Sequence, residues 1–296
     1  MKPLQIQGFP FYGLITPTPK VAGSNPVRHT TKRHLLLQVP FDLTGKLPVC
    51  SGDVSGSGVC RKGAGVMELK NFNDFCREMR HCGFSMGGGN AKGIFALVDY
   101  DWTNQEELDT PVKWHCGDPE VDPWEWRMRV LEECTDIAYS KVFFKTSGFI
   151  TRDWYPYFFA VRRNGESLVE AYERGGVSHT AKQIYDIVSE GYVALHEIKA
   201  LGGFGKEDKA KFDRALVELQ MGLFITMTGR KQKKSKYGIE YGWNSTVFTT
   251  VENFWAERDF VIPELDAGDS CEKIRGQILL LNPEAEEKTV RKFIKG

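Results

Sequence analysis

The sequence predicts an α+β fold that is mainly helical. Three observations support this: apolar residues recur at helical spacing in much of the chain after residue 66, two short strand-like runs follow one another before residue 250, and apolar residues make up 41% of the 296 residues. A chain of this length and composition buries one or two hydrophobic cores without disulfides or metal ions.

Residues 67–165 are predicted to form an aromatic-rich helical region. The segment MELKNFNDFCREMRHCGF has apolar residues at helical spacing and ends at Gly83. Further along, Asp122 and Pro123 are of the residue types preferred at a helix N-cap and at the first helical position. The dense aromatic residues between 143 and 159 are typical of a core, and a surface on which exposed bases stack is the functional alternative.

Residues 176–255 are predicted to form three helices followed by a β-hairpin. The segments SHTAKQIYDIVSEGY, VALHEIKALGG and KEDKAKFDRALVELQMGL each have apolar residues at helical spacing. LFITMTG and GWNSTVFTT then read as two strands, joined by RKQKKSKYGIEY. This order of elements indicates a winged helix, in which the hairpin is the wing. The tail at 256–296 is expected to be helical.

Residues 1–66 differ from the remainder in composition and charge. They carry eight Lys or Arg and two Asp, which leaves 31 basic and 37 acidic residues for the remainder of a chain with no net charge. Their lack of periodicity is typical of a disordered extension. The string GSNP at 23–26 can be encoded by a sequence resembling the T-arm of a bacterial transfer RNA gene. One hypothesis is therefore a non-native extension with the true start at Met67, and the alternative is an ordinary low-complexity extension.

The seven cysteines are scattered and odd in number, which favours reduced thiols and a cytoplasmic protein. No apolar run reaches the length of a membrane helix, and the first residues lack the order of a signal peptide. Cys76, His81 and Cys82 come nearest to ligand spacing, but no second close pair follows them. We therefore expect no metal, no cofactor and no membrane partner, and the sequence leaves the oligomeric state open.

Positive charge is concentrated in the third helix of the predicted winged helix and in the hairpin. Five of the seven residues from 230 to 236 are basic, and cations at a wing tip reach DNA phosphates. Because the chain after residue 66 is acidic as a whole, any DNA contact is expected to be local and sensitive to salt. The predicted DNA-binding residues are Lys209, Lys211, Arg214, Arg230, Lys231, Lys233, Lys234 and Lys236.

Three long strings carry a family resemblance: GDPEVDPWEWRMRV, GFITRDWYPYFFAVRR and FDRALVELQM. Over residues 67–255 the chain resembles the small bacterial AlkZ-related proteins, relatives of AlkZ-type DNA glycosylases that are built from winged-helix units. The resemblance implies a partner in double-stranded DNA, including damaged DNA, and a role in DNA repair. AlkZ-type enzymes use a Gln-x-Gln or Gln-x-Asp motif. The matching string here is Gln220, Met221 and Gly222, so Gln220 is the catalytic candidate and Gly222 lacks the second polar side chain.

Three functions follow as alternatives: a DNA-binding winged-helix protein, a DNA glycosylase that excises damaged bases through Gln220, and a winged-helix module that binds protein. Helical spacing from Phe212 brings Gln220 to the flank of the buried stripe, where its amide is expected to face a groove. An amide is a poor general base, and Gly222 supplies no partner for it. We therefore predict DNA binding without robust base excision, and a Gln220→Ala variant that keeps its fold.

Overall fold

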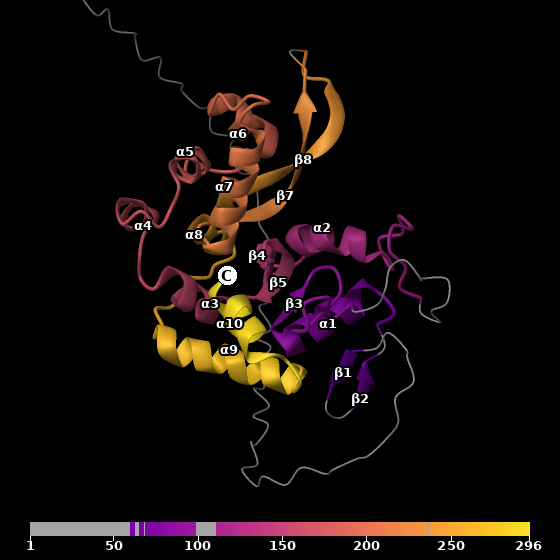
Figure 1. Cartoon of the computed structure of the whole chain (residues 1–296). Coiled ribbons are helices and arrows are strands. Elements are labelled where there is room, and N and C mark those ends of the chain that lie inside the picture. Colours follow the sequence, from indigo (N-terminus) through magenta and orange to yellow (C-terminus); the bar gives the residue numbers. More distant parts are fainter. Residues whose placement is uncertain (1–59, 63–64, 68, 99–110, 236) are drawn as a thin grey trace, which may run out of the picture. The chain divides into compact units, whose positions relative to one another are not determined.

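A computed structural model describes residues 60–62, 65–67, 69–98, 111–235 and 237–296, all of them within the part of the chain from Val54 to Gly296 (Figure 1). Within these residues the fold is α+β and mainly helical with small antiparallel sheets, which confirms the predicted class. Residues 1–59, to which most of the hypothesis of a start at Met67 refers, lie outside the described residues. The strands β1 (Cys60–Lys62) and β2 (Gly65–Met67) pair antiparallel on either side of residues 63 and 64.

The chain from residue 72 to residue 151 contains a three-stranded antiparallel sheet with two helices packed against it. Its elements are α1 (Phe72–Cys82), β3 (Phe84–Met86), α2 (Pro123–Glu133), β4 (Ile137–Phe143) and β5 (Thr146–Thr151). The strand order is β3-β5-β4. The helical region predicted at 67–165 thus also contains a three-stranded sheet that the sequence did not predict, while both helices lie where the sequence predicts them and Asp122 caps α2.

The β4–β5 hairpin is not predicted from the sequence, because the residues of its turn are not those typical of a two-residue hairpin. Phe143 pairs with Thr146, and the two residues between them, Phe144 and Lys145, have positive φ angles of 50° and 63°. Two positive φ angles define the turn that matches the twist of a two-residue hairpin, and Asn-Gly or Asp-Gly is its usual signal. Gly148 adds a second requirement, because a Cβ there would lie 2.3 Å from the Phe143 ring.

The chain from residue 179 to residue 250 contains the three helices and the hairpin that the sequence predicts. They are α5 (His179–Val188), α6 (Leu195–Leu201), α7 (Lys209–Met221), β7 (Ile225–Lys234) and β8 (Glu240–Thr250), with the short strand β6 (Val193–Ala194) before α6. The strand order is β6-β8-β7. Both three-stranded sheets thus follow one plan: a helix, a short strand, further helical structure and a hairpin whose second strand pairs with the short strand.

The two sheets and their helices share one hydrophobic core. Strand β4 contacts both α7 and β7, and α2 lies along β7 (Figure 1). Arg230 of β7 reaches two carboxylates of α2, with nitrogen to oxygen distances of 3.5 Å to Glu125 and 3.6 Å to Glu132. The base of the β7–β8 hairpin is therefore held against the first sheet, which orients its far end.

Five further helices complete the described part of the fold. They are α3 (Tyr155–Arg163), α4 (Leu168–Glu173), α8 (Val251–Ala256), α9 (Ala267–Leu281) and α10 (Glu287–Lys295). Helices α9 and α10 pack on α3, and the ring of Phe293 stacks on that of Phe143 with centroids 3.9 Å apart. The tail after residue 256 is thus helical, as predicted, and contributes buried side chains to the core.

Arg162 joins three parts of the fold that are distant in sequence. Its guanidinium donates hydrogen bonds to the carbonyl oxygens of Val142 at 2.6 Å, Met221 at 3.0 Å, Phe293 at 2.8 Å and Ile294 at 3.0 Å. These acceptors lie in β4, at the end of α7 and in α10. One planar group with five N–H donors therefore satisfies backbone groups at the point where β4, α7 and α10 meet.

Candidate nucleic-acid interface

The β7–β8 hairpin has strands longer than the sequence predicts and a short turn. Ser235 closes the turn: its amide donates to the carbonyl oxygen of Ile239 at 2.8 Å, and its hydroxyl accepts from the amides of Tyr237 and Ile239. Gly238 has a φ of 78°, which a side chain would disfavour. The strands run out to Lys234 and Glu240, so Arg230, Lys231, Lys233 and Lys234 lie in strand β7 and not in a loop at its tip. Lys236 lies outside the described residues.

Most of the described hairpin cations already have carboxylate partners. The Lys231 ammonium lies 2.6 Å from Glu197 of α6, and the Lys234 ammonium lies 3.8 Å from Glu240 across the hairpin. Arg230 faces the two carboxylates of α2 described above. Within the part of the chain that the structure describes, Lys233 is the hairpin cation without a carboxylate inside ion-pair distance.

Helix α7 carries the other three predicted DNA-binding cations. Lys209 forms an ion pair with Asp213 one turn later. Lys211 and Arg214 are exposed, and among the described residues neither has a carboxylate within ion-pair distance. Because residues three apart lie on one face of a helix, these two cations form a small positive face on α7.

The end of the hairpin exposes large apolar side chains that sequence analysis did not single out. Tyr237, Ile239, Tyr241 and Trp243 are 77%, 67%, 53% and 95% exposed. Their spacing of two residues in YGIEYGW was a sequence signal for an apolar strand face, because side chains two apart in a strand share a face. In the structure Tyr241 and Trp243 lie in β8, while Tyr237 and Ile239 lie in the turn before it. We refer to these four side chains as the apolar tip.

Gln220 is fully buried and its amide is occupied by the protein. Its Oε1 accepts from the Ser140 hydroxyl at 2.9 Å and from the Lys141 amide at 3.1 Å, while its Nε2 donates to the Leu216 carbonyl oxygen at 2.8 Å. The expectation that this amide faces a groove is therefore wrong. Helical spacing places the side chain correctly at the edge of the buried stripe, but β4 packs on that edge and covers it.

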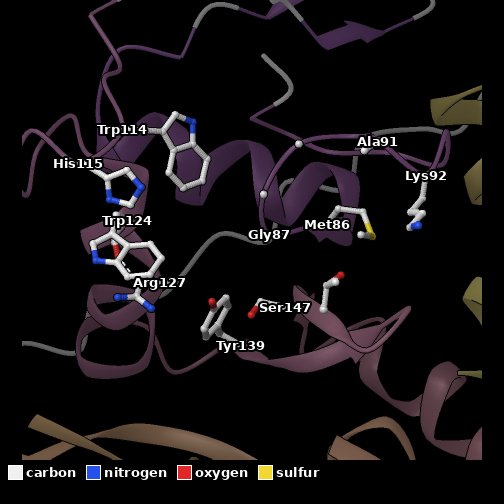
Figure 2. A pocket seen from close by; sticks show the side chains of 13 residues that line it. Met86, Gly87, Ala91, Lys92, Trp114, His115, Trp124, Arg127, Tyr139 and Ser147 are labelled. Carbon is white, nitrogen blue, oxygen red and sulfur yellow. Dashed lines mark hydrogen bonds between the residues drawn. The ribbon is translucent and has the colours of Figure 1, made fainter. Parts of the chain in front are cut away.

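The structure also contains a recess lined by aromatic side chains, which Figure 2 shows from close by. It lies between the end of β3, the start of α2 and the strands β4 and β5. One part of the recess is lined by the rings of Trp114, His115, Trp124 and Tyr139, and the other part is lined by Lys92. The sequence did not predict this recess, because the lining residues come from segments far apart in the chain.

Neither a metal site nor a membrane span is found in the part of the chain that the structure covers. No group of three or more His, Cys, Asp or Glu side chains among the described residues is arranged to hold a metal ion. Cys76 and Cys82 are buried, and the thiol of Cys76 lies 3.6 Å from that of Cys134. None of the described helices is both long enough and apolar enough to cross a membrane.

Comparisons with known proteins agree with the resemblance seen in the sequence. A family model described as AlkZ related matches residues 69–295. Among solved structures, the chain is similar to Streptomyces sahachiroi DNA glycosylase AlkZ, with a TM-score of 0.33 and 10% sequence identity over 58% of this chain. The match covers 50% of that glycosylase, so the chain corresponds to about half of its length. A comparison with curated proteins gives no match.

Proposed function

The chain belongs to the AlkZ-related family, and on that premise we propose that it binds double-stranded DNA through a winged helix. The winged helix consists of α5, α6, α7 and the β7–β8 hairpin, in the order of elements that this fold requires. In such folds a helix enters the major groove while neighbouring elements contact the backbone. Here α7 is the helix that carries exposed cations, and the hairpin is the wing.

The observation that carries the proposal is the composition of the wing. The apolar tip exposes four large side chains on an extended hairpin, beside a strand that contains four described Lys or Arg residues. An exposed apolar group of this size is costly in water unless a partner covers it. Cations attract phosphates, while aromatic and aliphatic side chains wedge between or stack on bases. DNA offers both kinds of contact in one groove.

The ion pairs decide which cations are available to DNA. Lys211, Arg214 and Lys233 have no carboxylate partner among the described residues, so they can bind phosphates without first breaking an ion pair. Lys231, Lys234, Lys209 and Arg230 must exchange a carboxylate for a phosphate. We therefore propose that the first three residues dominate the electrostatic contact and that the other four contribute less, while the predicted contact of Lys236 stays a prediction.

The proposed role in DNA repair is recognition of duplex DNA and not base excision through Gln220. A catalytic amide must reach the sugar of the damaged nucleotide, but the three hydrogen bonds of Gln220 hold it inside the core. Freeing it would leave the Ser140 hydroxyl and the Lys141 amide without their acceptor. Binding of a protein partner by the apolar tip is the competing function, and it differs in its dependence on salt.

The test is a titration of a fluorescent duplex at several salt concentrations, with DNA that is undamaged or alkylated. We expect the logarithm of affinity to fall linearly with the logarithm of salt concentration. Changing Lys211, Arg214 and Lys233 together to Ala removes up to three phosphate contacts, so the slope should fall by roughly 2 to 3 units at about 0.9 per contact.

A matched control removes the same charge from another exposed surface. Three exposed lysines of α10, namely Lys288, Lys292 and Lys295, serve for this, because changing all three to Ala alters the net charge equally. This control should leave the slope within about 1 unit of that of the unchanged protein. Equal slopes for both triple variants would refute the proposed surface, and absence of any DNA binding would favour a protein partner.

A further inference from the structure

We infer that the aromatic recess is a binding site for an unpaired nucleobase together with its 5′-phosphate. The site is separate from the wing, and the inference stands on the recess itself. The cavity has a volume of about 320 Å³. This lies at the lower end of the range of about 300–1,000 Å³ for small-molecule sites, which suits one nucleotide and not a large cofactor.

One part of the recess is a wall of rings held in a fixed position. The His115 and Trp124 rings lie 4.9 Å apart, and the Arg127 guanidinium lies 3.2 Å from the centre of the Trp124 ring. Figure 2 shows these groups on one side of the cavity, with Trp114 above them. Aromatic side chains of this kind stack on any base, because every base has a π face.

Asp122 sets the position of this wall. Its buried carboxylate accepts from the amides of His115 at 3.0 Å, Gly117 at 2.9 Å and Trp124 at 2.8 Å. His115 has a φ of 58°, an uncommon conformation for a residue other than Gly. A backbone conformation of this kind persists only where its surroundings impose it, and it is concentrated at ligand sites. The N-cap of α2 therefore also organises the aromatic wall in advance of binding.

The lining of the recess also includes the hydroxyl-bearing side chains of Tyr139 and Ser147. Tyr139 is only 5% exposed and it lines the recess (Figure 2). Ser147 lies beside it on the same side of the cavity (Figure 2). These hydroxyls can donate to and accept from the polar edge of a base.

The charge of the lining selects an anionic ligand. Lys92 and Arg127 line the cavity, and no acidic side chain is among the described residues that do so. Lys92 is exposed, and its ammonium has no carboxylate partner in the described segments. Aromatic recesses also bind quaternary ammonium groups, but two cations in the lining would repel such a ligand. A planar base stacked on the rings and a phosphate near Lys92 contact both the aromatic and the cationic part of the lining.

Two sources can supply this ligand: a nucleotide unstacked from a DNA strand or a free mononucleotide. Binding of deoxyadenosine 5′-monophosphate, deoxyadenosine, an oligonucleotide of single-stranded DNA and a fully paired duplex should be measured by calorimetry. We expect the monophosphate or the single strand to bind, and the free nucleoside to bind more weakly than its monophosphate. Comparison of the affinities for the monophosphate and for the single strand identifies which of the two sources supplies the ligand. Failure of both the monophosphate and the single strand to bind at about millimolar concentration, the weak limit for a specific ligand, would overturn the inference.

Two variants separate the site from general charge effects. Tyr139→Phe removes one hydroxyl and should weaken binding about 3- to 10-fold, the factor of one hydrogen bond. Lys92→Ala should weaken the monophosphate about 5-fold and leave the nucleoside unchanged, as expected for one partly solvated charge pair. Lys113→Ala is the matched control, because Lys113 is exposed next to Trp114 but does not line the recess. Equal affinities for all three variants and the unchanged protein would overturn the inference.

The same variants distinguish this site from the proposed wing. The triple change at Lys211, Arg214 and Lys233 should weaken duplex binding and leave mononucleotide binding unchanged. Tyr139→Phe should leave the salt slope of duplex binding unchanged. Loss of mononucleotide binding in the triple variant would show that the ligand binds at the wing, and it would overturn the assignment to the recess.

Discussion

Replacing Gln220 by Ala tests whether this residue serves the fold or the chemistry. The substitution removes three hydrogen bonds that join α7 to β4 and to its own preceding turn. Each such bond contributes about 1 kcal/mol net, and the lost burial of one methylene group adds about 0.8 kcal/mol. Allowing for partial relaxation around the new cavity, we expect the free energy of unfolding to fall by about 3 kcal/mol.

The measurement is urea unfolding at equilibrium, with the slope m compared between variants. An unchanged m shows that the lower midpoint reflects stability and not a change in the unfolded state. Gln220→Met keeps the methylene groups and loses only the hydrogen bonds, so it should cost about 1 kcal/mol less than Gln220→Ala. Lys211→Ala on the same helix is exposed and should change stability by no more than about 0.5 kcal/mol.

A free energy of unfolding for Gln220→Ala within about 0.5 kcal/mol of the unchanged protein would refute the structural role, since no buried hydrogen-bond network is lost at so small a cost. Release of alkylated bases from DNA should be measured on the same samples. If the unchanged protein releases bases efficiently, and a Gln220→Ala variant that has kept its stability does not, base excision through Gln220 replaces DNA binding alone as the proposed function.

Three further predictions concern other parts of the molecule. Arg162→Lys keeps the charge, but an ammonium group cannot donate to the four carbonyl oxygens that the planar guanidinium reaches. We therefore expect the free energy of unfolding in urea to fall by about 2 kcal/mol. An unchanged midpoint of urea unfolding would contradict this. Trp243→Ala should change the free energy of unfolding by no more than about 0.5 kcal/mol, because the side chain is 95% exposed. It should weaken DNA binding about 5- to 100-fold, because the indole no longer stacks on a base or inserts between bases. An unchanged affinity for DNA would show that the apolar tip is not part of the interface. The hydrogen bonds from Arg80 hold the pKa of the Asp136 carboxyl below its usual value of 3.8, so the pair stabilises the fold above that pH and the contribution is lost as pH falls through the lower folded pKa. Arg80→Ala should therefore cost up to about 1 kcal/mol at pH 6 and progressively less below pH 3.8, and a cost that is constant with pH would contradict the assignment.

The sequence by itself determined the elements whose causes are local. Apolar spacing and the Asp122–Pro123 pair located α1 and α2, and the three helices and the hairpin at 176–255 followed from periodicity. Such signals can be recognised in the sequence because caps and helical spacing involve residues within about four positions of one another. The family resemblance was legible for the same reason, since it rests on continuous strings, and the match over residues 69–295 confirms it.

Only the tertiary structure decided what those elements do. Gln220 is buried because β4 packs over it, where the hydroxyl of Ser140, 80 positions earlier, donates a hydrogen bond to its amide oxygen. Helical spacing contains no information about what covers a flank. The pairing of Lys231 with Glu197, 34 positions away, likewise separates occupied cations from available ones. The aromatic recess combines a loop after β3, the start of α2 and the β4–β5 hairpin, whose turn lacks the usual residues. Contacts between distant segments depend on the packing of whole elements, which local patterns in a single sequence do not specify.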